Sequence, residues 1–310
     1  MKVISLCVPC YNEEDNVELM YEALTKVMLN LTRFDYEIVF IDNCSTDSTR
    51  TILRKVADKD KKVKVIFNLR NFGPNRSGAY GFFQATGDAV ISLACDFQNP
   101  PEMIPEFIKL WENGAKVVWG RKESSEESAL MWYTRSLYYK IIATFSEVKQ
   151  YTHITGFGLY DREVIENMKA LGDPVPNFRN QIPELGYEVD FIDFVQPLRE
   201  RGKSSYNLYR YFEAALSSLV NTSLAPLRMA TFAGFLVGVL SLLIGMIYLF
   251  LKLLFWNSFL FGTAPILIGL FFIGGVQLMF IGLLGEYIGE ILTRVTNRPM
   301  VIEKERINFE

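Results

Sequence analysis

Four short segments of the chain gather the acid, amide and hydroxyl side chains that could do chemistry. They read PCYNEE at 9–14, DNCSTD at 42–47, NLRNFG at 68–73 and CDFQNPPE at 95–102. Side chains of these types can hold a metal ion or a phosphate-bearing ligand. In the fourth segment Asp96 follows an apolar run without a second acid beside it, which poses the question of what charge a metal there would neutralise.

Apolar spacing predicts the elements that must position these segments. Short runs rich in β-branched residues predict strands at 3–9, 36–42, 63–68, 88–94 and 115–120, and helical spacing between 17 and 31 predicts a helix after the first strand. Strands that alternate with helices form a doubly wound, mostly parallel α/β sheet, which binds ligands beyond the carboxyl ends of its strands. Any one polar segment could be an ordinary capped turn. Four at one sheet edge favour a ligand site.

Composition narrows the classes of function. A net charge of -3 without a basic stripe argues against nucleic acid as a partner. The N-terminal MKVISLCVPC lacks the long apolar stretch and cleavage site of a signal peptide, so it reads as a first strand. Cys7 and Cys10 form a Cys-x-x-Cys pair, but Cys7 lies in a predicted strand, which favours buried reduced thiols over a redox motif.

The last third of the chain is apolar enough to enter a membrane. Residues 229–251 carry no charge, and these 23 residues make ~34 Å of helix, against ~30 Å for a hydrocarbon core. Residues 265–285 are also uncharged, so 228–290 predicts a hairpin of two spans, at about 229–252 and 264–286, rather than a buried helix pair. Basic residues flank one side of the hairpin and predict that both termini are cytoplasmic; they are Arg228, Arg294, Arg298, Lys304 and Arg306.

The segments on either side of the hairpin are also predicted to be cytoplasmic. In residues 201–227, apolar side chains between Leu208 and Leu219 share one helical face beside several tyrosines, which predicts an amphipathic helix lying on the bilayer. Residues 1–200 would form the α/β domain, and 291–310 a cytoplasmic tail. Glu290 and Arg294 have the spacing of a helical ion pair. Exposed aromatic membrane helices also suggest a homo-oligomer.

Together these segments resemble the polyisoprenyl-phosphate glycosyltransferases, family 2 enzymes that include dolichol-phosphate mannose synthases and bactoprenol-phosphate glucosyltransferases. The resemblance lies in CVPCYNEEDN, FIDNCSTDST, NLRNFGPNRSGAYGFFQATGDAVI and CDFQNPPE, and in GEYIGEILTRVTNRP at the end of the hairpin. It implies a GT-A fold and inverting transfer of a sugar from a nucleotide diphosphate sugar, with uracil as the expected base, to polyprenyl (undecaprenyl) phosphate. The cofactor would be Mg²⁺ or Mn²⁺, and the lipid-linked sugar would serve cell-envelope glycosylation.

The resemblance also implies site residues. Asp96 stands at the second acid of the family's Asp-x-Asp and would hold the metal with Gln98, while Arg121 and Arg199 would act with it in catalysis. Substrate contacts are expected from the polar segments and from two later cations; these residues are Pro9, Tyr11, Asn12, Glu13, Asp42, Asn43, Asn71, Gly73, Gln98, Arg135 and Lys203.

Several positions depart from the family pattern. Ala94 replaces the first acid of Asp-x-Asp, and Asn99 replaces the acid that follows Gln98. TGFGLY replaces a segment whose aspartate is a candidate base, so that Gly156 or a deletion stands there. Other family residues give way to Asn43, Pro74 and Ser205.

The chemistry tolerates these losses. Charge grows on the leaving diphosphate, and a divalent cation with arginine can stabilise it. Mg²⁺ takes only one or two carboxylates beside water and phosphate oxygens, so Asp96 can suffice. A phosphate monoester with a second pKa of ~6 is largely dianionic at neutral pH and needs positioning more than a base, and Arg199 or Arg135 could provide it.

Two other functions compete with polyprenyl-phosphate glycosyl transfer. A processive polysaccharide synthase would usually carry Gln-x-x-Arg-Trp and more spans, which the sequence lacks. A catalytically inactive relative, serving as a membrane scaffold or sugar-nucleotide-binding partner, is motivated by Ala94, Asn99 and Asn43. The presence of Asp96, Gln98, Glu13 and Arg121 opposes this reading and favours an enzyme. The expected location is the inner (cytoplasmic) membrane, which the chain would cross more than once.

Overall fold

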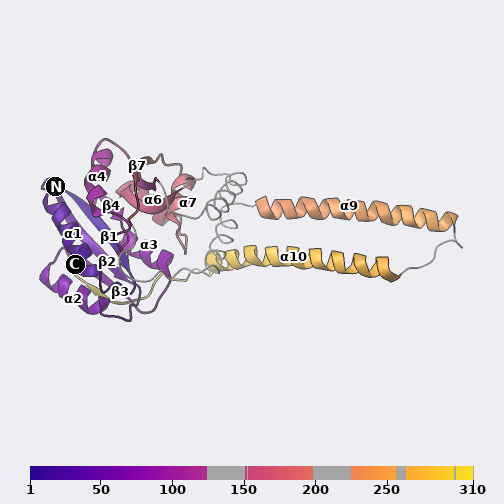
Figure 1. Cartoon of the computed structure of the whole chain (residues 1–310), viewed down its shortest axis with the longest axis horizontal. Coiled ribbons are helices and arrows are strands. Elements are labelled where there is room, and N and C mark those ends of the chain that lie inside the picture. Colours follow the sequence, from indigo (N-terminus) through magenta and orange to yellow (C-terminus); the bar gives the residue numbers. More distant parts are fainter. Residues whose placement is uncertain (124–150, 152, 198–224, 256–262, 297, 310) are drawn as a thin grey trace. The chain divides into compact units, whose positions relative to one another are not determined.

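The computed structural model describes residues 1–123, 151, 153–197, 225–255, 263–296 and 298–309, which divide into two compact units. An α/β unit holds the described residues up to 197 together with those from 298 onward, and a helical unit holds 225–296. Figure 1 labels their helices and strands.

Strands and helices alternate through the first part of the α/β unit, as the apolar spacing predicts. The elements in chain order are β1 (Lys2–Cys10), α1 (Val17–Leu29), β2 (Phe34–Asp42), α2 (Thr49–Lys59), β3 (Val63–Asn68), α3 (Pro74–Gln84), β4 (Ala89–Ser92), the 3-10 turn η1 (Pro101–Met103), α4 (Ile104–Glu112) and β5 (Val117–Lys122). The later elements are β6 (Ile154–Asp161), α6 (Arg162–Ala170), α7 (Phe178–Glu184), β7 (Asp190–Phe194) and β8 (Glu303–Ile307). The five predicted strands are therefore confirmed, whereas β6, β7 and β8 had not been predicted.

All eight strands form one mixed sheet in the order β7-β5-β6-β4-β1-β2-β3-β8. β1 pairs in parallel with β2 and β4, and β2 pairs in parallel with β3. β6 is antiparallel to both β4 and β5, so β5 runs in the same direction as β4, and β7 is parallel to β5. The carboxyl ends of β1 to β5 and β7 consequently share one edge of the sheet.

Helices cover both faces of the sheet because alternate strand residues point to opposite sides. Leu6 packs with buried residues of α1, α2 and α4 on one face. Cys7 packs with α3, α6 and α7 on the other. These layers, visible on either side of the strands in Figure 1, confirm the α/β architecture.

Helix α3 lies unusually close to the sheet because glycine occupies the contact. A Cβ added at Gly81 would lie 2.7 Å from Ile41 Cγ2, so only a residue without a side chain fits between helix and strand. This close packing fixes the height of α3 above β2 and, with it, the loop that leads into the helix.

The helical unit contains two long apolar helices, α9 (Ala225–Leu254) and α10 (Thr263–Val295). Many of their large apolar side chains are exposed, including Phe232, Phe235, Leu278 and Ile288. Within the described residues, Phe272–Val295 is long and apolar enough to cross a bilayer, and α9 carries a shorter apolar segment, Met229–Leu240. Both helices extend beyond the two predicted spans. The predicted Glu290–Arg294 ion pair is confirmed, with 3.0 Å between Oε1 and Nε.

Candidate functional site

The loop after β1 is fastened to the loop after β2. Asn12 adopts a positive φ of 55°, its N–H donates to Ser45 Oγ at 2.9 Å, and its Oδ1 accepts from the Thr46 N–H at 2.8 Å. The Glu13 N–H donates to Thr49 Oγ1 at 2.9 Å, at the start of α2. Tyr11 keeps 41% of its surface exposed on this fastened loop, so its ring is open to a ligand.

Asp42 lies beneath the second loop with a fully buried side chain. Its Oδ2 is 2.6 Å from Arg50 Nε, and both carboxylate oxygens accept from the Ser45 N–H. Arg50 also donates from Nη2 to the carbonyl of Asn68 at 2.7 Å, which joins the ends of β2 and β3. A buried carboxylate needs such partners to remain charged. Asp42 was expected to contact substrate, but in this structure its carboxylate holds the loop from below.

Three amide side chains, Asn43, Asn68 and Asn71, form an amide cluster between the second and third loops. Asn43 donates to Asn71 Oδ1 at 3.0 Å and accepts from the Asn68 amide at 3.2 Å and the Phe72 N–H at 2.9 Å. Asn71 Oδ1 also accepts from the N–H of Gly73, whose φ of 87° favours glycine. The cluster therefore fixes the backbone that leads into α3. Asn43 and Asn71 had been expected at the site, whereas Asn68 had not.

The loop after β4 is closed by two side-chain hydrogen bonds. Asp96 Oδ1 accepts from the Gln98 N–H at 3.2 Å, and the buried Asn99 Oδ1 accepts from the Ala94 N–H at 2.8 Å. Phe97 between them has a φ of 60°. Asn99, which replaces an acid of the family pattern, is therefore a structural brace of this loop. Pro101 follows the loop and begins the 3-10 turn η1.

The four cysteines are free thiols, and three of them are buried. Cys7, Cys10 and Cys95 are buried, and Cys44 is half-buried. Burial, followed by a hydrogen bond with Cys95, raises the pKa of Cys10 well above its ordinary value. A thiol in this state reacts slowly, as the interpretation of these cysteines as core residues requires.

The donor set around Asp96 suits a divalent cation that brings most of its own ligands. Asp96 and Gln98 are half-buried and offer carboxylate and carboxamide oxygens, the donors that Mg²⁺ and Mn²⁺ prefer. Within the described part of the chain, no three acids, histidines or cysteines converge as a metal site. The residues therefore fit a cation that completes its shell with water and phosphate oxygens, and not a protein-enclosed cation.

Arg121 lies near the end of β5, on the same sheet edge, paired with an acid that the sequence analysis missed. Its Nε and Nη2 donate to the two carboxylate oxygens of Asp193 at 2.6 and 2.9 Å, and the two residues are in register on β5 and β7. The guanidinium also lies over the Phe191 ring, 5.1 Å from its centroid. Hydrogen bonding between the two side chains lowers the pKa of Asp193 and raises the pKa of Arg121. Both side chains are exposed, so a ligand can reach the pair.

Pro9, and Gly156 at the family's candidate base position, lie within the described residues, whereas three predicted cations do not. Pro9 lies at the end of β1 beside Gly78 of α3, where an added Cβ would be 3.8 Å from the proline ring. Gly156 lies inside β6 with a φ of 89°, and its carbonyl accepts from the Tyr160 hydroxyl at 2.9 Å. Arg135, Arg199 and Lys203 fall outside the described residues.

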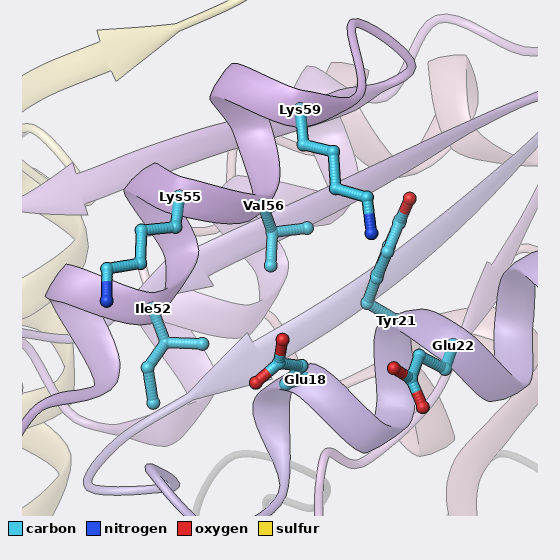
Figure 2. Close-up of a pocket in the computed structure, with 7 residues that line it drawn as sticks. All are labelled: Glu18, Tyr21, Glu22, Ile52, Lys55, Val56 and Lys59. Carbon is cyan, nitrogen blue, oxygen red and sulfur yellow. The ribbon is translucent and has the colours of Figure 1, made fainter.

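A pocket between two helices of the α/β unit lies apart from the strand-end loops. It lies between α1 and α2, and Figure 2 shows acidic side chains on one helix opposite basic side chains on the other. Its lining residues are Glu18, Tyr21, Glu22, Ile52, Lys55, Val56 and Lys59. Opposed charges at the surface of two packed helices are typical of a solvated contact, so the strand-end loops remain the candidate site.

Comparison with known proteins adds a family match. Residues 5–168 match the model of glycosyl transferase family 2. The chain is 35% identical over 303 residues to the SfII prophage-derived bactoprenol glucosyl transferase of Shigella flexneri, covering 97% of each protein. It is 31% identical over 308 residues to an uncharacterized glycosyltransferase of Synechocystis sp., covering 99% of this chain and 96% of that one.

More distant matches occur among solved structures. Glucosyl-3-phosphoglycerate synthase of Mycobacterium tuberculosis, solved with Mn²⁺, UDP and glucosyl-3-phosphoglycerate, is 16% identical with a TM-score of 0.47, covering 72% of this chain and 80% of that one. A mannosyltransferase of Pyrobaculum calidifontis, solved with GDP-Man and Mn²⁺, is 17% identical with a TM-score of 0.47, covering 74% and 64%.

Proposed function

Because this chain belongs to glycosyl transferase family 2 and is a glycosyltransferase, we propose that it moves a sugar from a nucleotide diphosphate sugar to polyprenyl phosphate. The preferred donor is a UDP-sugar, and undecaprenyl phosphate is the preferred acceptor. The observation that carries the proposal is the full-length match to a bactoprenol glucosyl transferase, because it includes the strand-end loops and both apolar helices.

The donor would bind across the carboxyl ends of β1 to β4. Tyr11 offers an exposed aromatic ring for the base, and Asn12 and Glu13 lie on the same fastened loop. Asp42, Asn43 and Asn71 would hold the adjoining backbone in place, since their polar groups already bond to it. Rigid loops of this kind lower the entropy lost when a ligand binds.

Asp96 and Gln98 would hold Mg²⁺ or Mn²⁺ between the protein and the donor diphosphate. When bound, the cation would neutralise charge that develops on the leaving diphosphate. Arg121 would add a second positive group at the same edge, where Asp193 and Phe191 keep its guanidinium oriented. In this proposal, the metal at Asp96 neutralises charge that the donor diphosphate brings, and a second acid beside Asp96 is not required.

The transfer would proceed by direct displacement. An oxygen of the dianionic acceptor phosphate attacks the anomeric carbon, the bond from that carbon to the diphosphate oxygen breaks, and the configuration inverts. The nucleoside diphosphate leaves with the bonding electron pair. Because the attacking oxygen carries no proton, Gly156 at the family's candidate base position does not prevent the reaction. Arg135, Arg199 and Lys203 remain the proposed acceptor contacts.

The apolar helices would anchor the enzyme as a two-span hairpin with both termini in the cytoplasm. α9 and α10 expose large apolar side chains, as helices in lipid do. Chain connectivity supports an even number of crossings: β8 follows α10 yet joins the sheet formed before α9. A chain that crossed once could not return β8 to that sheet. Residues 201–227 would lie on the membrane surface, and exposed helix faces would allow a homo-oligomer.

The test is transfer by the purified full-length protein in detergent. Radiolabelled nucleotide sugars are offered one at a time with undecaprenyl phosphate and either Mg²⁺ or Mn²⁺, and the lipid fraction is counted. We expect metal-dependent lipid-linked sugar from one donor, lost in Asp96→Ala. If a folded wild-type protein labels no lipid from any donor but binds a nucleotide sugar, the chain is the inactive binding relative instead. Unchanged activity in Asp96→Ala would refute only the metal assignment.

A further inference from the structure

The C-terminal strand β8 closes the edge of the sheet beside the candidate donor loops. It pairs antiparallel with β3, with Phe67 opposite Glu305 and Asn68 opposite Glu303. The N–H of Leu69, directly after β3, donates to the carbonyl of Ile302 at 2.9 Å. Because the pairing is antiparallel, β8 begins at the carboxyl end of β3, where the third loop leaves the sheet. Figure 1 shows this yellow strand beside β3.

One side chain of β8 forms hydrogen bonds with α2. Glu305 accepts two hydrogen bonds from the Arg54 guanidinium, of which the bond from Nη2 is 2.6 Å. Arg54 is held over the Phe67 ring, 4.4 Å from its centroid. The hydrogen bond from Arg54 lowers the pKa of Glu305. Past the strand, Asn308 donates to the carbonyl of Ala57 near the end of α2 at 2.8 Å.

Other side chains of β8 form hydrogen bonds with α3. The Tyr80 hydroxyl donates to Glu303 Oε1 at 2.8 Å. Arg306 donates from Nη2 to Glu303 Oε1 at 2.5 Å and to Gln84 Oε1 at 2.9 Å. The strand is thereby bonded to the two helices that follow the second and third loops.

Both helices carry residues that hold the donor loops. In the first turn of α2, Thr49 accepts from the Glu13 N–H and Arg50 pairs with Asp42. In α3, Ser77 Oγ accepts from Asn68 of the amide cluster at 2.9 Å. A displacement of either helix would therefore move polar groups at the strand ends.

We propose that β8 is a positioning element for the donor nucleotide, and that its Glu305–Arg54 contact sets the placement of α2 and the loops attached to it. This inference rests on the proposed function. In the chain, β8 (Glu303–Ile307) is the next described element after α10 (Thr263–Val295). The observed side-chain bonds of β8 reach α2 and α3, so the strand acts through these two helices.

The test reverses the charges of the Glu305–Arg54 pair in the full-length protein. Glu305→Arg places two cations together, Arg54→Glu places two anions together, and the double variant restores an opposite pair. The matched control is Lys304→Glu, which changes the charge of the same strand by the same magnitude as Glu305→Arg, in the opposite direction, at an exposed position. Binding of UDP and of GDP with Mg²⁺ is measured by calorimetry, transfer gives KM and kcat, and thermal unfolding reports the fold.

Each single reversal should weaken nucleotide binding and raise the donor KM by about tenfold, with kcat changed by less than about twofold. The double variant should recover to within about threefold of the wild type, and Lys304→Glu should resemble the wild type. A merely structural contact would lower the unfolding temperature and leave the KM of the folded protein unchanged, which would overturn the inference.

Two further outcomes separate this inference from the proposed function. If the wild type binds UDP or GDP and all the variants bind it equally, β8 has no positioning role while the proposed function stands. If the wild type binds neither nucleotide and transfers no sugar from any donor, the proposed function fails and the positioning role fails with it. Should Glu305→Arg not fold, Glu305→Gln removes the negative charge without placing two cations together, and it is expected to raise the donor KM about threefold.

Discussion

Two ion pairs at the same sheet edge have the same closest distance but differ in how far they are exposed to solvent. Asp42 and Arg50 approach to 2.6 Å, with the Asp42 side chain fully buried and the Arg50 side chain 21% exposed. Arg121 and Asp193 also approach to 2.6 Å, but their side chains are 46% and 43% exposed. A buried carboxylate cannot change partners without leaving a charge in the interior, whereas an exposed pair can accept a third group. The first pair therefore holds the loops of the candidate site, and the second is accessible to a ligand.

Breaking the buried pair should have the largest effect on stability. Asp42→Asn removes the charge that neutralises Arg50 and weakens its link between the ends of β2 and β3. We expect a loss of about 3 kcal/mol in the free energy of unfolding, measured by urea unfolding of the protein in detergent. Asp193→Asn is the control, and its unfolding should match the wild type. Equal loss in the two variants would remove the distinction between the pairs.

Removing the exposed cation should affect transfer and leave the fold intact. Arg121→Ala should lower kcat/KM by about a hundredfold, equivalent to about 2.7 kcal/mol, because one positive group facing the developing charge is lost. Arg121→Lys should recover only part of this, since lysine cannot make the two parallel bonds to Asp193. Steady-state kinetics measure both variants. Normal transfer by Arg121→Ala would show that the pair is a surface contact only.

The loop after β4 offers an intermediate test. Asn99→Ala removes the buried acceptor of the Ala94 N–H and should cost about 1 to 2 kcal/mol of stability in urea unfolding. Asn99→Asp keeps an acceptor oxygen and adds a charge near Asp96. It should therefore lower the Mg²⁺ concentration that gives half-maximal transfer. An unchanged Mg²⁺ requirement would place residue 99 away from the metal.

The smallest effect is expected for the acid of the exposed pair. Asp193→Asn keeps a hydrogen-bond acceptor beside Arg121, so the donor KM should rise only about threefold with kcat unchanged. Because Arg121 lowers the pKa of Asp193, the wild-type pair is complete above the ordinary range of an aspartate and is lost as the pH falls through the lowered value. The difference in KM between variant and wild type should therefore be constant from about pH 6 to pH 8. A difference that disappears within this range would contradict the assignment.

The first strands and the location of the site followed from local sequence pattern. Short apolar runs rich in β-branched residues predict β1 to β5, and the polar segments that end β1 to β4 come to one edge once the strands are parallel. Asp96, Asn43, Asn71 and Arg121 were found this way or by family resemblance. The sequence also determined that two long apolar helices follow the α/β domain.

The tertiary structure decided which of these polar residues bond to one another. The burial of Asp42 on Arg50, the entry of Asn68 into the amide cluster and the bracing role of Asn99 depend on how neighbouring loops meet. The Arg121–Asp193 pair joins residues 72 positions apart, and the Arg54–Glu305 pair joins residues 251 positions apart. Apolar periodicity encodes the type of an element and its buried face. The choice of strand partners, and hence the place of β8 beside β3, arises only when the whole sheet assembles.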